Sequence, residues 1–353
     1  MSYYSNLKYH YSQQTCKMKK LLFLSLLLLT ACSLPLADLA TPTPTAANAP
    51  TPQATIQVQP TAEPGTEANP LILALAPSPN PSATAIAAAG SLAQKLQDAT
   101  GLKIVTVAPA YEADLVKAFA IGNAHIGLLS PYGYFLAHEN GDVNAMLANL
   151  RNGQSLYGAQ FLARSDSGFK RYYDPARDEN TAEAKEALAQ FNGKKPCWSD
   201  PLSPSGYVVP LGALKQAGVQ TASPAFVEGQ GTVVRAIYSK GICDFGATYV
   251  DARDLPVLEQ DYPDVKEKVV VIWRIPAIIP YEQIVVAARL NPQVKQSLLR
   301  AFIDIMGTDE GRALIQTVYG IDAFQPADET LYRDFSDFLR ASELDVNSLL
   351  KLP

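Results

Sequence analysis

Apolar segments of strand length alternate with helix-forming segments along most of the chain after residue 70. Residues 71–76 form a continuous apolar run, residues 83–98 have the length and composition of a helix, and residues 102–107 are again apolar. Strands that are apolar throughout and separated by helices are typical of mostly parallel sheets with helices on both faces. The pattern predicts an α/β fold. Further strands are expected at 125–130, 158–163, 196–199, 225–228, 242–249 and 269–273, and a helix at 112–121.

The residues from about 70 to 353 are enough for two compact lobes and too many for one ordinary domain. The family resemblance given below implies that residues 70–156 and 275–353 form lobe 1 and that residues 157–274 form lobe 2, with two crossing strands as the hinge. Ligands in such folds bind beyond the carboxyl ends of strands, so the cleft between the lobes is the expected ligand site. Helices that pack on lobe 1 are expected at 301–306, 311–319 and 331–341.

The N-terminal segment has the pattern of an export signal. A basic stretch beginning at Met18 is followed by a short leucine-rich run and by small residues directly before Cys32. The run is short for a permanent membrane helix, which is the alternative, and the small residues suit a peptidase. This segment resembles a bacterial lipoprotein signal. It predicts a signal peptide at 1–31, with Met18 as the true start, and a lipid on Cys32 that tethers the protein to the outer face of a membrane.

Residues 32–69 are rich in proline, threonine and alanine and carry few large apolar side chains. Such a composition predicts an extended tether rather than a folded domain. The full chain has a formal net charge of −5, and loss of residues 1–31 removes four lysines and no acidic residue, which leaves −9. An acidic surface argues against nucleic acid as a partner.

The segment 198–207 places two hydroxyls and a glycine at the expected start of a helix. Ser203 is a good N-cap, Pro204 suits the first helical position, and Ser205 and Gly206 follow with backbone N–H groups. Free N–H groups and the positive end of the helix dipole favour an anion without any basic side chain. An ordinary capped helix is the alternative.

Polar side chains follow several of the predicted strands, where a ligand is expected. Each alone is equally compatible with turn formation or packing. These residues are Ser78 and Asn80 after the first strand, Tyr111 after the second, Ser130 after the third, Gln230 after 225–228 and Asp251 after 242–249.

Five segments of the chain together resemble a known family, the phosphate/phosphite/phosphonate-binding lipoproteins of ABC transporters. The resemblance runs over roughly 70–325 and implies the two-lobed type II periplasmic-binding-protein fold with the ligand in the interlobe cleft. The most diagnostic segment is 200–207, in which family members usually have Ser-Thr-Ser-Gly and this chain has Ser-Pro-Ser-Gly. The other segments are 76–81, 127–134, 241–249 and 271–276.

The resemblance implies a set of ligand-binding residues. It assigns the phosphorus oxyanion to Ser203, Ser205 and Gly206, and it places Gln230 where phosphonate binders often have a histidine. A carboxylate in such a site pairs with an amine on the ligand or accepts a hydrogen bond from a protonated oxyanion; capping of a helix is the alternative. The further residues that it matches are Tyr111, Tyr157, Asp251 and Glu282.

Cysteine and histidine usage fits an exported binding protein. Cys197 and Cys243 stand near the ends of strands expected to be neighbours, which predicts a disulfide, with two buried thiols as the alternative. Three histidines and no Cys-x-x-Cys motif argue against a metal site. The chain has no Gly-x-Ser-x-Gly, P-loop or His-Glu-x-x-His motif, so we expect no enzyme and no cofactor.

The function expected from these features is capture of a small phosphorus oxyanion by a monomer and its delivery to an ABC transporter permease. The same fold also serves sensors that signal to a membrane kinase, and binders of a sulfonate or a thiamine precursor. These two alternatives remain open at the level of the sequence.

Overall fold

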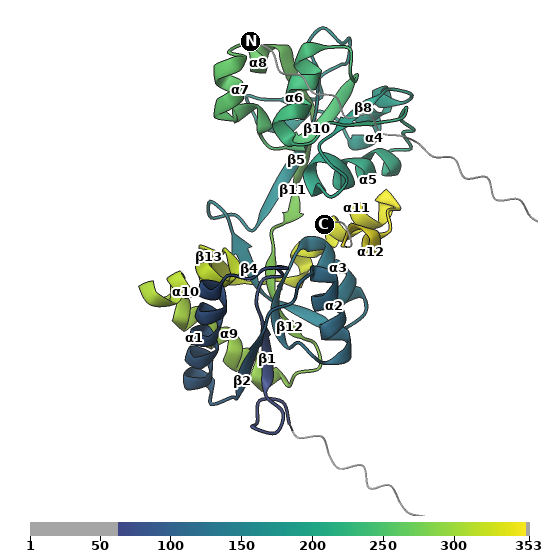
Figure 1. Ribbon diagram of the computed structural model, residues 1–353. Helices are drawn as coiled ribbons and strands as arrows, with labels where there is room; N and C mark the ends of the chain where they lie inside the picture. Colours follow the sequence, from purple (N-terminus) through teal and green to yellow (C-terminus); the bar gives the residue numbers. More distant parts are fainter. Residues whose placement is uncertain (1–62, 351–353) are drawn as a thin grey trace, which may run out of the picture. The chain divides into compact units, whose positions relative to one another are not determined.

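The computed structural model describes residues 63–350 (Figure 1). The signal peptide, Cys32 and nearly all of the expected tether lie outside the described residues. Within 63–350, no helix is both long enough and apolar enough to cross a bilayer. Two helix-flanked sheets form the described part, which confirms the α/β class.

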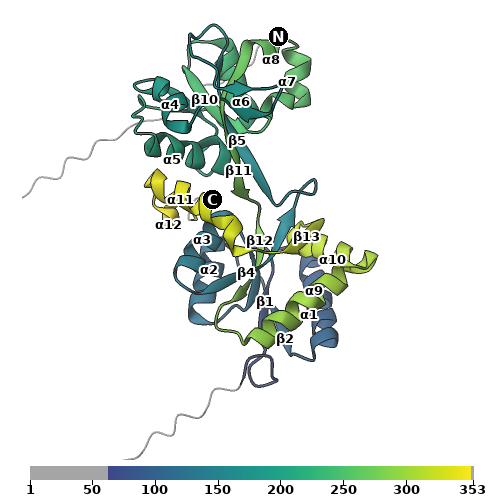
Figure 2. The same cartoon turned by 180° about the vertical axis from the view of Figure 1, so that it is seen from behind.

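The first sheet has six strands in the order β13-β4-β12-β3-β1-β2. Helices α1, α9 and α10 pack together on one side of this sheet, and α2 and α3 lie on the other (Figures 1 and 2). The strands are β1 (Leu71–Ala74), β2 (Ile104–Val107), β3 (Ile126–Leu129), β4 (Val143–Leu150), β12 (Gln283–Ala287) and β13 (Ala323–Pro326). The helices are α1 (Ala83–Thr100), α2 (Glu112–Ile121), α3 (Pro131–Glu139), α9 (Pro292–Met306) and α10 (Asp309–Tyr319).

Local chemistry sets the ends of these helices. The side chain of Ser82 caps α1 by accepting a hydrogen bond from the Ala85 N–H, and Gly101 ends the helix in the left-handed conformation with φ of 72°. Leu92 and Leu96 of α1 are fully buried against the sheet. The loops that follow β1, β2 and β3 therefore leave a rigid core, which positions their side chains for a site.

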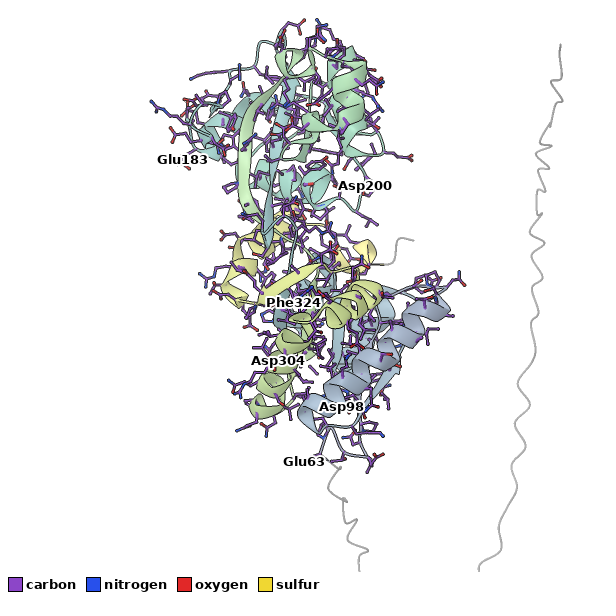
Figure 3. The ribbon with its side chains drawn as sticks, turned by 90° about the vertical axis from the view of Figure 1, so that its left-hand side faces the viewer. Glu63, Asp98, Glu183, Asp200, Asp304 and Phe324 are labelled. Carbon is purple, nitrogen blue, oxygen red and sulfur yellow. A yellow bond between two sulfur atoms is a disulfide. The ribbon has the colours of Figure 1, made fainter. Side chains whose placement is uncertain are left out.

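The second sheet has five strands in the order β11-β5-β10-β8-β9. Helix α6 packs on β10, β5 and β8, while α5 packs on β5. The strands are β5 (Leu156–Arg164), β8 (Pro196–Trp198), β9 (Ala225–Phe226), β10 (Phe245–Tyr249) and β11 (Val269–Pro280), and β6 (Tyr173–Asp174) pairs with β7 (Glu179–Asn180). The helices are α4 (Ala184–Leu188), α5 (Val209–Gln216), α6 (Gln230–Ser239), α7 (Pro256–Asp261) and α8 (Val265–Lys268). In Figure 3, Asp200 and Glu183 mark this half, and Asp98 and Asp304 mark the half with the first sheet.

The strand directions are mixed, and the expectation of mostly parallel sheets is corrected in this respect. Parallel pairing joins β1 to β2 and β3, and β8 to β9 and β10. In contrast, β12 runs antiparallel to β3 and β4, and β5 runs antiparallel to β10 and β11. The reason is that β5 and β12 enter their sheets directly from the other sheet, without a crossover helix that would turn the chain around.

Two chain segments connect the sheets side by side. One leads from β4 to β5 through residues 151–155, and the other leads from β11 to β12 through Tyr281 and Glu282. The backbone N–H of Tyr281 donates to Ser155 at 3.4 Å, and that of Asn149 donates to Glu282 at 3.3 Å. The two crossing segments are thus tied to each other by backbone hydrogen bonds.

The C-terminal helices correct a second expectation. Helix α11 (Arg333–Ser342) does not pack on the first half alone, because it lies along α5 of the second half (Figures 1 and 2). A side chain at Gly212 of α5 would overlap the backbone of Phe338, so the missing side chain permits the close approach of the two helices. Lys215 of α5 forms an ion pair with Glu343 at 2.5 Å. A short last helix, α12 (Val346–Leu349), then contacts α3 of the first half.

Candidate functional site

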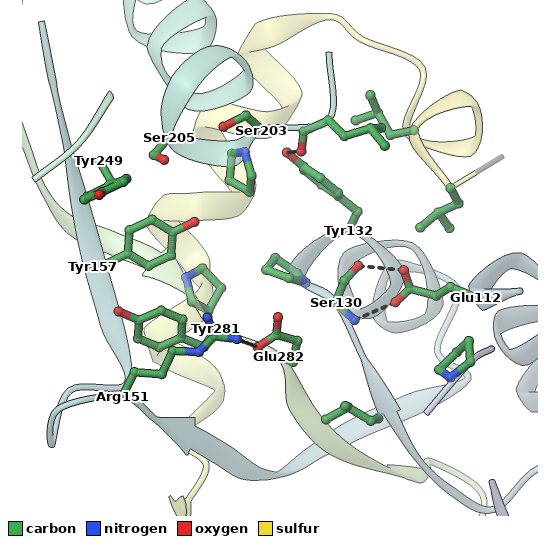
Figure 4. Close-up of a pocket in the computed structure, with 18 of the residues that line it drawn as sticks. Glu112, Ser130, Tyr132, Arg151, Tyr157, Ser203, Ser205, Tyr249, Tyr281 and Glu282 are labelled. Carbon is green, nitrogen blue, oxygen red and sulfur yellow. Dashed lines mark hydrogen bonds and ion pairs between the residues drawn. The ribbon is translucent and has the colours of Figure 1, made fainter. Parts of the chain in front are cut away.

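A cavity of about 1030 Å³ is lined by loops of both halves and by the crossing segments (Figure 4). Pro77, Tyr111, Ser130 and Tyr132 reach it from the first half. The second half contributes Tyr157, Ser203, Ser205, Gln230 and Tyr249, and the crossing segments contribute Arg151, Tyr281 and Glu282.

The serine segment begins a helix, as the sequence predicts. Ser203 is the N-cap, Pro204 begins the π-helical turn η2 (Pro204–Val208), and α5 continues from it. The hydroxyls of Ser203 and Ser205 belong to side chains only 7% and 3% exposed, although both residues line the cavity. The Gly206 N–H is not free, because it donates to the Ser203 Oγ at 2.9 Å. Gly206 therefore supports the loop, and the expectation of a free N–H at this residue is wrong.

Gln230 holds the serine hydroxyls together. Its Nε2 lies 2.9 Å from the Oγ of Ser203, 3.4 Å from that of Ser205 and 3.5 Å from that of Ser199. Its Oε1 accepts a hydrogen bond from the Tyr249 N–H at 3.2 Å, which fixes the orientation of the amide. The side chain therefore donates to the hydroxyl cluster from α6.

Tyr157, near the start of β5, faces the cluster (Figure 4). Burial raises the pKa of its hydroxyl, while a hydrogen bond with Ser205 acts in the opposite direction. The ring stacks on that of Tyr281, with centroids 4.9 Å apart. The guanidinium of Arg151 lies 4.8 Å from the centroid of the Tyr281 ring. Two tyrosines and an arginine thus form one side of the cavity.

Glu282 is paired within the chain. Its Oε2 accepts hydrogen bonds from Arg151 at 2.7 Å and from the Asn149 side chain at 3.2 Å. The sequence predicts an anion site without basic side chains, and the presence of Arg151 in the cavity lining corrects that expectation. The arginine charge is nevertheless balanced by Glu282.

A second carboxylate enters the cavity from the first half. Glu112 begins α2, and its two oxygens accept hydrogen bonds from the backbone N–H and the hydroxyl of Ser130, at 2.5 and 2.9 Å. Burial raises the pKa of Glu112, although the hydrogen bonds from Ser130 and its backbone favour the ionised form. Ser130 lines the cavity as expected from the sequence, but its hydroxyl is directed to Glu112.

Besides Gly206, three predicted ligand residues do not line the cavity. The Ser78 hydroxyl accepts a hydrogen bond from the Asn80 N–H at 3.3 Å, so both residues shape the turn after β1 while the neighbouring Pro77 and Pro79 reach the cavity. The carboxylate of Asp251 binds Arg253 and accepts from Gln160 at 2.8 Å. Asp251 thus has partners within the chain and lies outside the cavity lining. Tyr111 does line the cavity, and 57% of its surface is exposed.

Several lining residues were not predicted from the sequence. Glu112 was not predicted to be a site residue, because an acidic residue in the first turn of a helix usually interacts with the helix dipole. Arg151 and Tyr281 lie in the short crossing segments, where no periodicity identifies them. Leu349 and Leu350 lie far along the chain in a segment without any motif.

Cys197 of β8 and Cys243, which precedes β10, form a disulfide with Cα atoms 5.6 Å apart. The bond joins two neighbouring parallel strands of the second sheet, beneath the loop that carries Ser203. Within residues 63–350, no group of three or more His, Cys, Asp or Glu side chains is arranged to hold a metal ion.

Comparison with known proteins places this geometry in a family. The family described as "ABC transporter, phosphonate, periplasmic substrate-binding protein" matches residues 74–332. The phosphate-import protein PhnD of Mycolicibacterium smegmatis is 27% identical over 182 residues, which cover 48% of this chain and 52% of that protein. The match thus spans about half the length of this relative.

Solved structures agree on the fold. XAC2383 from Xanthomonas citri, bound to chloride ion, superposes with a TM-score of 0.54 and 16% identity over 77% of this chain and 97% of that chain. The structure of the same protein bound to ATP superposes with a TM-score of 0.53 and 16% identity, over 77% of this chain and 96% of that chain. This likeness shows that the chain shares its fold with XAC2383. The matched family consists of transport proteins rather than enzymes. Because the family match covers most of the chain, the protein belongs to the periplasmic substrate-binding proteins of phosphonate ABC transporters.

Proposed function

We propose that this protein captures a small phosphorus oxyanion, a phosphonate, phosphite or phosphate, outside the cytoplasm and delivers it to an ABC transporter permease. The observation that carries the proposal is the convergence of the Ser203, Ser205 and Tyr157 hydroxyls on one cavity in a chain of this family. Hydroxyl donors in a partly desolvated cavity bind an oxyanion strongly, because each hydrogen bond to a charged group is worth about 1.5–3 kcal/mol. The phosphate import named for the mycobacterial relative supports the same ligand class.

The carboxylates of the cavity bear on the nature of the ligand. Glu282 is paired with Arg151, and Glu112 accepts two hydrogen bonds from Ser130. Both acids therefore have partners within the chain, so an amine on the ligand is not needed to balance them. This favours a ligand that binds mainly through its oxyanion, which the hydroxyls hold close to the Glu282–Arg151 pair. It disfavours a ligand that binds mainly through a cationic amine.

We propose lobe boundaries at 70–156 with 275–353, and at 157–274, with the crossing segments as the hinge and α11 in contact with both lobes. Closure around the ligand would give the transporter a loaded form to recognise. The lipid on Cys32, the tether to residue 69 and the monomeric state belong to the same proposal.

Isothermal titration of the purified protein with phosphate, phosphite, methylphosphonate and 2-aminoethylphosphonate tests the function. We expect at least one of the four to bind, and Ser205→Ala to weaken that ligand by about 1–3 kcal/mol through loss of a buried donor. Ser336→Ala is the matched control, because the Ser336 hydroxyl donates to the Tyr332 carbonyl, away from the cavity. Absence of binding by all four compounds, or an unchanged affinity in Ser205→Ala, contradicts the proposed site.

A further inference from the structure

The cavity has an apolar wall next to the serine hydroxyls. The wall consists of Tyr132, Leu202, Leu349 and Leu350, all of which line the cavity. Leu349 and Leu350 are only 8% and 9% exposed and belong to the main hydrophobic core. Leu202 directly precedes Ser203 in the chain, so the wall is continuous with the hydroxyl cluster.

The wall is held in place from both halves. The Tyr132 hydroxyl of α3 donates to the Leu202 carbonyl at 3.1 Å, and its ring lies 6.1 Å from that of Phe335 in α11. Arg340 of α11 forms an ion pair with Glu139 of α3 at 2.8 Å. Because α11 also packs on α5, the chain that leads to Leu349 is fixed by contacts with both halves.

The size of the cavity exceeds what an inorganic oxyanion fills. At about 30 Å³ for each heavy atom, the volume of a water in the liquid, a phosphate occupies on the order of 150 Å³. Before the proposed closure of the halves, the cavity measures about 1030 Å³, which is at the upper end for small-molecule sites. Pro204 adds to its apolar surface at the position where the resemblance implies a threonine hydroxyl.

We propose that the site selects a phosphonate with an apolar alkyl or aryl substituent of several carbons over inorganic phosphate. The oxyanion binds the hydroxyls of Ser203 and Ser205, and the substituent lies against the apolar wall. This inference rests on the proposed function, since it assumes a phosphorus oxyanion at the serine hydroxyls. Transfer of each methylene from water to the wall supplies the selectivity.

Titration of the full protein with phosphate and with methyl-, propyl-, hexyl- and phenylphosphonate tests the inference. We expect the Kd to fall up to about fourfold for each added methylene, which corresponds to about 0.8 kcal/mol of burial. A Kd that stays constant or rises from methyl- to hexylphosphonate overturns the inference and leaves the proposed function intact. Failure of every phosphorus acid to bind overturns both.

Variants of the apolar wall test whether it contacts the substituent of the ligand, and a core variant controls for loss of protein stability. Leu349→Ala is expected to reduce the preference for hexyl- over methylphosphonate at least threefold, because the longer substituent loses more contact with the wall. Leu202→Ala serves the same purpose if Leu349→Ala does not fold. The matched control is Leu290→Ala, because Leu290 is buried in the same core but does not line the cavity. An equal loss for both phosphonates shows that the wall does not contact the substituent and contradicts the inference.

Discussion

Individual side chains of the cavity are fixed by partners within the chain rather than left free for a ligand. Ser130 illustrates this, because both its N–H and its hydroxyl donate to the Glu112 carboxylate. Sequence reasoning identified Ser130 as a residue of the site from its place after a strand, which the cavity lining agrees with. It did not identify Glu112 as its partner, because the pairing joins residues eighteen positions apart through the fold.

The buried carboxylate of Glu112 makes stability depend on pH. Burial raises its pKa, so the folded protein binds this proton more tightly than the unfolded chain. The resulting stabilisation is complete below the unfolded pKa and is lost as the pH rises through the folded pKa. We therefore expect the unfolding free energy of Glu112→Gln to rise relative to the parent protein between pH 4 and pH 7, as measured by urea denaturation.

Glu259→Gln is the matched control for this experiment, because Glu259 also lies in the first turn of a helix but is exposed. If the difference in unfolding free energy between Glu112→Gln and the parent protein does not vary with pH, burial does not raise the pKa of Glu112.

Helices and strands were predictable to different degrees. The helix at Glu112–Ile121 and the N-cap at Ser203 follow from capping and composition, which are local. Strands β4, β12 and β13 were not predicted, because β4 and β12 each adjoin another strand in the chain and β13 is not a continuous apolar run. The expected packing of α11 on the first half alone was wrong. Gly212 allows α11 to approach α5, but the sequence does not show that these two helices are neighbours. The expectation for Asp251 failed for a similar reason, because position after a strand does not reveal an arginine partner.

Two glycine substitutions separate the effect of the α5–α11 contact on stability from the effect of helix propensity. Gly212→Ala places a methyl group against the Phe338 backbone, so we expect it to destabilise the protein by about 1–3 kcal/mol. Gly90→Ala, in an open and exposed part of α1, is expected to stabilise it by about 0.5–1 kcal/mol. Thermal or urea unfolding of both variants provides the measurement. Stabilisation of the protein by Gly212→Ala would indicate that α11 does not lie against α5 in solution.

At the scale of the whole molecule, the chain passes between the sheets in two neighbouring segments, and the cavity is lined by both halves and by these segments. The resemblance implied such a two-lobed arrangement, but the residues of the crossing segments that line the cavity were not predictable, because they belong to no regular element. Backbone hydrogen bonds tie the two segments to each other, so under the proposed hinge they would move together.

Ligand binding is expected to protect the crossing segments from amide hydrogen exchange. At a ligand concentration of 100 Kd the folded state gains about 2.7 kcal/mol relative to the unfolded chain. Beyond this global gain, residues 151–155 and Glu282 should show added protection, because closure orders them. Helix α10, which is remote from the cavity lining, is the internal control. Equal protection of both regions would argue against a hinge at the crossing segments.

The amide nitrogen of Gln230 lies within 3.5 Å of three serine hydroxyls, to which it can offer two hydrogens, and this affects binding in acid. Each serine oxygen that accepts from the amide keeps its own hydrogen available to point outward at an incoming oxyanion. An imidazole at the same place would gain a proton near neutrality and change the direction of these bonds. A carboxamide has no such transition, so the polarity of the hydroxyl cluster stays constant across the pH range in which histidine sites switch.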